Sequence, residues 1–184
     1  MPGDLLPVFL ACLGTDTRLI LSGEIGAGKT SVAIHLAAEL GEQGVAVGGV
    51  LSPRIVQDGA TVGYTVRDLA TDEERPFAAL TPPGVRVGKF FIVEEGLAFA
   101  CGAIEHAAEH AQVGFVDEVG RLELAGGGLA SAIRVLLRSA TCPILLVRSV
   151  FVDAVVRTFA IARFKELPVE QEALLSRERK AWDG

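Results

Sequence analysis

The sequence predicts an α/β fold, in which a mostly parallel sheet is sandwiched by helices and carries an antiparallel hairpin insertion. Short apolar runs alternate with longer amphipathic segments, as is typical of parallel strands joined by crossover helices. Half of the 184 residues are hydrophobic, a level that suits strands buried on both faces. We expect a single domain, residues 1–184, with the insertion at about residues 52–93.

The first two predicted strands flank a helix. Residues 18–22 form an apolar run followed by a turn, and residues 29–40 carry apolar side chains at helical spacing. The apolar run at residues 45–51 predicts a second strand. Because a strand, a helix and a strand in this order nearly always form a right-handed crossover, we expect the two strands to be parallel.

The predicted insertion has the pattern of antiparallel strands. Asp58 and Gly59 predict the turn of a hairpin between strands at residues 55–56 and 61–66, and a further strand is expected at residues 89–93. Beyond the insertion, strands and helices alternate again. Buried strands are expected at residues 113–116 and 143–147, and helices at residues 94–111, 129–138, 152–161 and 170–182.

The composition argues against several functional classes. No run of about 18 apolar residues is present, and the apolar start of the chain contains Asp4 and lacks a basic segment, so we expect a cytoplasmic protein without a membrane segment. A net charge of −6 argues against strong nucleic-acid binding, which requires a basic surface. The three cysteines lack metal-ligand spacing and are expected to be reduced and buried.

One glycine-rich segment has the spacing of a phosphate-binding loop. Residues 23–30 read GEIGAGKT, which matches the Walker A pattern GxxxxGK[ST] between a predicted strand and a predicted helix. Glycines allow backbone N–H groups to approach a phosphate closely, and the helix N-terminus adds the positive end of its dipole. The expected nucleotide-binding residues are Gly23, Glu24, Ile25, Gly26, Ala27, Gly28, Lys29, Thr30 and Ser31.

Catalysis requires groups that act on the terminal phosphate. We expect Lys29 to reach the β- and γ-phosphates and the Thr30 hydroxyl to bind Mg²⁺. The apolar run at residues 113–116 ends in two acids. Asp117 is the expected Walker B acid, which holds Mg²⁺ through a water molecule. Glu118 is the expected base that activates the attacking water.

A further cation is expected to stabilise the charge that develops on the γ-phosphate. Arg121 follows the two acids closely and is the catalytic candidate, while Arg54 and Arg148 are alternatives. The helix at residues 94–111 also contains an HxxEH pattern, His106 to His110. We interpret this pattern as a solvated helix face, because a zinc site would need a third ligand.

The segment DEVGRLEL at residues 117–124 resembles the D-E-[IV]-G-[KR]-[ML]-E-L motif of a small nucleoside-triphosphatase family first described from thermophiles. The vertebrate member of that family is called cancer-related nucleoside-triphosphatase. Residues 49–64 and the VGKF segment at residues 87–90 also resemble the family. The resemblance implies a compact RecA-like P-loop fold and slow Mg²⁺-dependent hydrolysis of ATP, GTP and other nucleoside triphosphates. It assigns no role to Glu123.

Two other functions remain open from the sequence. A nucleoside or polynucleotide kinase would use the same phosphate loop together with an acceptor pocket. A nucleotide-controlled switch or chaperone would use slow hydrolysis to time the release of a protein partner, with residues 52–93 as the partner surface. The sequence predicts neither the preferred base nor the oligomeric state.

Overall fold

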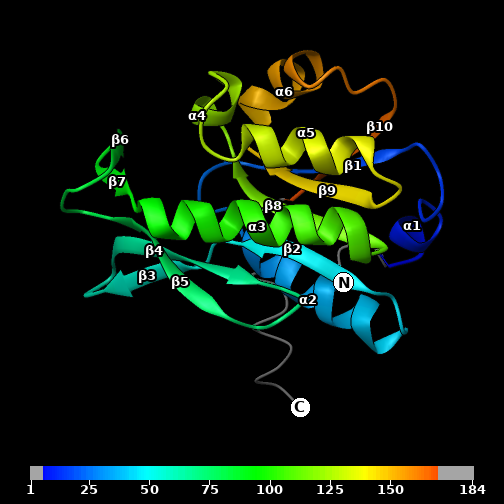
Figure 1. Ribbon diagram of the computed structural model, residues 1–184, viewed down its shortest axis with the longest axis horizontal. Helices are drawn as coiled ribbons and strands as arrows, with labels where there is room; N and C mark the ends of the chain where they lie inside the picture. Colours follow the sequence, from blue (N-terminus) through cyan, green and yellow to red (C-terminus); the bar gives the residue numbers. More distant parts are fainter. Residues whose placement is uncertain (1–5, 170–184) are drawn as a thin grey trace.

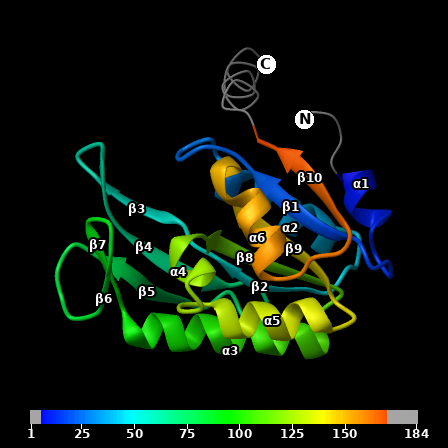
Figure 2. The same ribbon diagram turned by 90° about the horizontal axis from the view of Figure 1, so that it is seen from above.

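The computed structural model describes residues 6–169, in which ten strands form one mixed sheet with helices on both faces (Figures 1 and 2). This arrangement confirms the predicted α/β class. The parallel half has the strand order β10 (Phe164–Pro168), β1 (Arg18–Ser22), β9 (Cys142–Val147), β8 (Val113–Val119) and β2 (Val47–Leu51). No helix in the described part of the chain has the length and apolar character needed to cross a membrane.

The insertion continues the same sheet instead of forming a separate unit. Its strands are β3 (Arg54–Gln57), β4 (Ala60–Asp68), β5 (Glu74–Ala79), β6 (Val85–Val87) and β7 (Phe90–Ile92). β4 pairs antiparallel with β2, and β5, β7 and β6 follow outward, while β3 pairs with β4 alone. The predicted hairpin with its turn at Asp58 and Gly59 is therefore confirmed.

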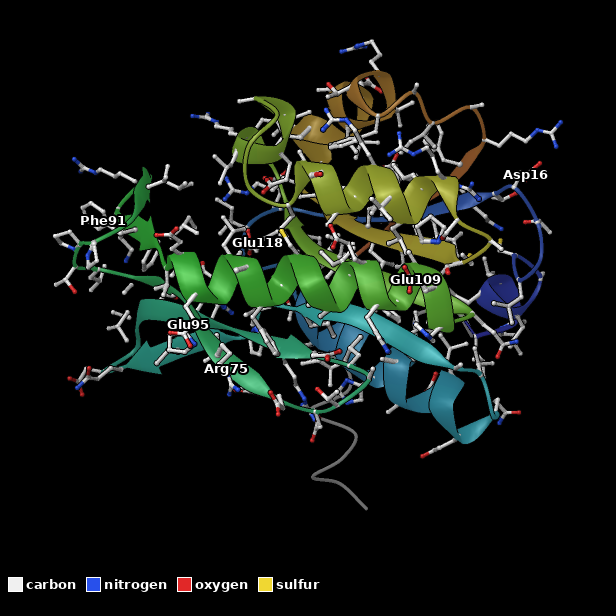
Figure 3. The ribbon with its side chains drawn as sticks, in the orientation of Figure 1. Asp16, Arg75, Phe91, Glu95, Glu109 and Glu118 are labelled. Atoms are coloured by element: carbon white, nitrogen blue, oxygen red, sulfur yellow. The ribbon has the colours of Figure 1, made fainter. Side chains whose placement is uncertain are left out.

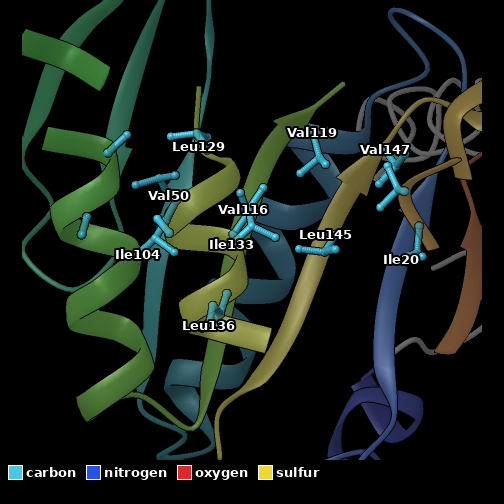
Figure 4. Packing of buried hydrophobic residues seen from close by; sticks show 14 of the residues in the cluster. Ile20, Val50, Ile104, Val116, Val119, Leu129, Ile133, Leu136, Leu145 and Val147 are labelled. Atoms are coloured by element: carbon cyan, nitrogen blue, oxygen red, sulfur yellow. The ribbon is translucent and has the colours of Figure 1, made fainter. Parts of the chain in front are cut away.

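The helices cover the sheet in two layers. On one face α1 (Leu6–Leu10) and α2 (Lys29–Glu42) bury Leu19 and Leu21 of β1. On the other face lie α3 (Glu94–His110), α5 (Ala130–Arg138) and α6 (Val152–Thr158), which bury Ile20 of the same strand (Figure 4). Because alternate strand residues point to opposite faces, the continuous apolar strand serves both layers.

Several boundaries differ from the sequence prediction. The strand expected to end at residue 116 extends as β8 to Val119, because Val119 still pairs with Val147 of β9 across an irregularity in the ladder. Asp117 and Glu118 therefore lie within the strand. Helix α6 ends at Thr158, three residues earlier than predicted. The helix predicted at residues 170–182 lies outside the described residues.

Six short elements were not predicted from the sequence. They are α1, β5, β6, α4 (Arg121–Leu124), the 3₁₀ helix η1 (Ser149–Phe151) and β10. The strand β10 pairs only with β1 and is mostly exposed, and β6 is exposed along its whole length. Strands at a sheet edge lack the apolar run that marks a buried strand, so the sequence pattern does not identify them.

Candidate functional site

The glycine-rich loop lies between β1 and α2, and α2 begins at Lys29 as predicted. Gly26 and Gly28 have φ angles of 79° and 92°, in the left-handed region that favours glycine. The first backbone N–H groups of α2 have no backbone partner within the helix, and the residue before the helix supplies no side-chain cap. The Lys29 Nζ donates to the carbonyl oxygens of Gly23 at 2.8 Å and Glu24 at 3.0 Å.

Asp117 joins this loop to the end of β8. The Thr30 hydroxyl donates to Asp117 Oδ2 at 2.8 Å, and the Ser52 backbone N–H donates to the same oxygen at 3.1 Å. The Glu118 backbone N–H donates to Asp117 Oδ1 at 2.8 Å. The carboxyl group is only 2% exposed, and this burial raises its pKa, while the hydrogen bonds favour the charged form. Two side-chain oxygens from distant segments thus meet at one point.

Glu118 stands beside this pair in an unusual backbone conformation. Its φ angle of 60° lies in the left-handed region, which is uncommon for a residue with a side chain and often occurs at functional sites. The side chain is accessible from a cavity, and Figure 3 shows Glu118 near the end of β8. Desolvation by the surrounding protein and the neighbouring Asp117 raise the pKa of Glu118 to about 7. Arg148 and Lys29 act in the opposite direction.

The cavity beside these groups has a volume of about 910 Å³. It is lined by Asp117, Glu118 and six residues of the predicted loop: Ile25, Gly26, Gly28, Lys29, Thr30 and Ser31. The other three loop residues do not line it. Gly23 and Ala27 are buried within the loop, and Glu24 is exposed outside the cavity.

All three candidate arginines line the cavity. Arg148 directly follows β9, and its charge acts on both Lys29 and Glu118. The Arg121 guanidinium lies over the Phe151 ring, 5.8 Å from its centroid. Within residues 6–169, none of the three arginines forms an ion pair.

Glu123 has a structural role that the sequence did not indicate. Its side chain is buried, and Oε2 accepts the Gly120 N–H at 3.0 Å while Oε1 accepts the Leu129 N–H at 3.3 Å. These bonds cap the start of α4 and fix the segment that follows Glu118. A Glu three residues into a short helix is the sequence signal for such a cap, but the contact with Leu129 depends on the fold.

The two histidines of the HxxEH pattern contact each other on α3. His106 and His110 stack on α3 with ring centroids 4.3 Å apart, and the His110 ring bonds to the His106 carbonyl. No cluster of three or more His, Cys, Asp or Glu residues suitable for a metal occurs between residues 6 and 169.

Comparison with known sequences identifies relatives of this chain. The model of a family described as NTPase matches residues 18–172. The nucleoside-triphosphatase THEP1 of Methanopyrus kandleri is 33% identical over 117 residues, 64% of this chain and 65% of that protein. The THEP1 protein of Thermofilum pendens is 40% identical over 109 residues, 58% of this chain and 60% of that protein. The chain thus matches less than two thirds of the length of these two relatives.

A third relative, the nucleoside-triphosphatase THEP1 of Thermococcus kodakarensis, is 30% identical over 141 residues, 74% of this chain and 78% of that protein. The solution structure of a human cancer-related nucleoside triphosphatase has a TM-score of 0.66 at 22% identity, covering 90% of this chain and 96% of that one. The crystal structure of THEP1 from Aquifex aeolicus has a TM-score of 0.69 at 17% identity, covering 85% and 91%. These two structures share the fold.

Proposed function

The chain belongs to the NTPase family of small P-loop proteins, and from this we propose that it hydrolyses nucleoside 5′-triphosphates, ATP and GTP among them, to the diphosphate and phosphate. The observation that carries the proposal is the 2.8 Å hydrogen bond between the Thr30 hydroxyl and Asp117. It brings the phosphate loop and the strand acid within reach of one metal ion, although 87 positions separate them in the sequence.

The loop supplies the groups that bind the phosphates. Backbone N–H groups at the start of α2 and the Lys29 ammonium would hold the β- and γ-phosphates. Burial lowers the pKa of Lys29, whereas Glu118 and Asp117 oppose this effect. A bound polyphosphate would favour the charged lysine further, because an opposite charge stabilises it. The two hydrogen bonds that the Lys29 ammonium donates to loop carbonyls can be exchanged for bonds to phosphate oxygens.

The residues at this point also fit Mg²⁺. Mg²⁺ prefers oxygen ligands and is commonly held by one or two protein groups together with water and substrate phosphates. The Thr30 hydroxyl and the buried Asp117 carboxylate provide such oxygens. When bound, the ion would neutralise charge on the β- and γ-phosphates.

Glu118 is the group that favours hydrolysis. Its carboxylate faces the cavity beside Asp117, where it can accept a proton from a water molecule attacking the γ-phosphorus. The bond between that phosphorus and the β–γ bridging oxygen then breaks. A cation facing the same space would stabilise the departing charge, and Arg148 and Arg121 are both available.

Phosphate release from ATP, GTP, CTP and UTP, measured without an added acceptor, tests the proposal. Lys29→Ala should abolish nucleotide binding or hydrolysis, and wild-type activity would exclude the assigned site. Glu118→Gln should retain Mg²⁺–nucleotide binding but lose about 10²-fold or more in turnover. The matched control is Glu105→Gln, which changes an exposed acid on α3 and should leave turnover unchanged. Full activity in Glu118→Gln would remove it as the base.

A further inference from the structure

The cavity extends from the phosphate loop to two β-hairpins of the insertion. The β3–β4 and β6–β7 hairpins line its far side, and the β6–β7 hairpin projects from the sheet at the left of Figure 1. The hairpin residues that matter here are two cations, two aromatic residues and two valines: Arg54, Lys89, Tyr64, Phe90, Val56 and Val87. We call this set the hairpin subsite.

The hairpin subsite lies beyond the expected position of the γ-phosphate. In the sheet, β9, β8 and β2 separate β1, which leads into the phosphate loop, from β4 of the insertion. Tyr64 lies on β4, where it pairs with Arg54 of β3. Glu118 lies on β8, and therefore between the strand that leads into the phosphate loop and the strands of the hairpins. A triphosphate bound to the loop would end near Glu118, with its nucleoside at the opposite end of the phosphate chain, away from the hairpins.

Specific contacts join the two hairpins to each other. The Lys89 Nζ, at the tip of the β6–β7 hairpin, donates to the carbonyl oxygen of Thr61 on β4 at 3.0 Å. The rings of Tyr64 and Phe90 meet edge to face, with centroids 5.3 Å apart and an angle of 82° between their planes. These contacts connect strands that are not neighbours in the sheet, since β5 lies between β4 and β7. They give the far wall of the cavity a defined shape.

The side chains of the hairpin subsite suit a ligand that is both anionic and partly apolar. Neither Arg54 nor Lys89 forms an ion pair within residues 6–169, although the whole chain has a net charge of −6. The Lys89 ammonium lies 4.9 Å from the centroid of Phe90. Val56 is 57% exposed and Val87 is 36% exposed, yet both line the cavity. Exposed apolar side chains beside convergent polar groups are typical of a small-molecule site.

We propose that the hairpin subsite binds a second ligand, a nucleoside monophosphate, alongside the nucleotide on the phosphate loop. Arg54 and Lys89 hold its phosphate, and its flat base lies against the aromatic and valine side chains. This binding proposal goes beyond the proposed hydrolysis. It depends on the proposed function only for the nucleotide that occupies the phosphate loop. The cavity volume of about 910 Å³ is near the upper end of the range for drug-sized ligands, about 300–1,000 Å³.

Calorimetric titration of AMP, GMP, CMP and UMP tests this assignment in two backgrounds. One is the wild-type protein saturated with Mg²⁺ and ADP, and the other is Lys29→Ala, whose fold is checked by circular dichroism. Both backgrounds remove the phosphate loop as a competing site, and neither depends on turnover. At least one monophosphate should bind in both with similar affinity. Failure of hydrolysis alone would leave this result unaffected.

Variants then locate the bound ligand. Arg54→Ala and Tyr64→Ala should each weaken binding about tenfold or more, whereas Tyr64→Phe, which retains the ring, should weaken it less. The matched control is Arg86→Ala, which removes an arginine of the β6–β7 hairpin that lies outside the cavity lining and should have no effect. Ribose 5-phosphate and inorganic phosphate, which lack the base, should bind more weakly than the monophosphate.

Three results would overturn the assignment. The first is that none of the four monophosphates binds at about 10 mM, a concentration that would detect even a very weak site. The second is that Mg²⁺ and ADP on the loop abolish all binding, which would place the monophosphate on the loop itself. The third is that Arg54→Ala and Tyr64→Ala bind the monophosphate as tightly as Arg86→Ala does.

Discussion

Replacing Glu123 with alanine would show how strongly a buried carboxylate stabilises the segment that follows the catalytic acids. Both of its oxygens accept backbone N–H groups, from Gly120 and from Leu129. Leu129 is 1% exposed, so its N–H cannot find a water molecule after the substitution. A buried donor left without a partner costs about 1–3 kcal/mol. Gly120 is partly accessible, so water can replace the lost acceptor and the loss of this hydrogen bond costs less.

The loss of these two hydrogen bonds together predicts that Glu123→Ala lowers the free energy of unfolding by about 3 kcal/mol. For a chain of this size each kcal/mol shifts the melting temperature by about 2–4 °C, so the expected decrease is about 6–12 °C. Glu123→Gln keeps one acceptor oxygen, so its melting temperature should lie between those of the wild type and Glu123→Ala. The measurement is thermal unfolding followed by circular dichroism, alongside phosphate release well below the transition. Turnover should fall as well, because Gly120 lies two residues after Glu118.

The matched control for this prediction is Glu105→Ala, which removes an exposed carboxylate from α3. Its stability should stay within about 0.5 kcal/mol of the wild type. If Glu123→Ala melted within about 1 °C of the wild type, the two N–H groups would have found other partners and the capping argument would be refuted.

Three further predictions concern the site and the core. Asp117→Asn should raise the Mg²⁺ concentration needed for phosphate release, because an amide is a weaker metal ligand than a carboxylate; an unchanged Mg²⁺ titration would contradict its role. Arg148→Ala should slow phosphate release more than Arg121→Ala does, and the reverse order would favour Arg121. Burial raises the pKa of Cys142 to about 11, so its alkylation at pH 8, followed by mass spectrometry, should be far slower in the native than in the unfolded protein. Equal rates would contradict that burial.

The sequence predicted the parts of the site that are encoded locally. The residues of the phosphate loop must be consecutive, because adjacent backbone groups surround one phosphate, and the structure places most of them along the cavity. The two sequence patterns assigned Thr30 and Asp117 to the same Mg²⁺, and in the structure the Thr30 hydroxyl donates to Asp117 Oδ2 at 2.8 Å. The metal itself stays a prediction. The role of each residue in catalysis remains a prediction.

The sequence did not predict contacts that depend on tertiary structure. Nothing near Ser52 indicates that its backbone N–H bonds to Asp117, because the contact arises only when β2 lies beside β8. Phe90 falls in the strand expected at residues 89–93 and lies on β7, but it also lines the cavity and contacts Tyr64. Such contacts between hairpins have no counterpart in the periodicity of either segment.

The strand order explains why Arg148 is a better-placed cation than Arg121. In the sheet β9 lies between β1, which leads into the phosphate loop, and β8, which carries the acids. Arg148, directly after β9, therefore lies between Lys29 and Glu118, and its charge acts on both of these groups. The Arg121 guanidinium instead lies over Phe151, on the segment after β9. It would have to leave that ring to reach a γ-phosphate, whereas Arg148 already faces the groups that surround one.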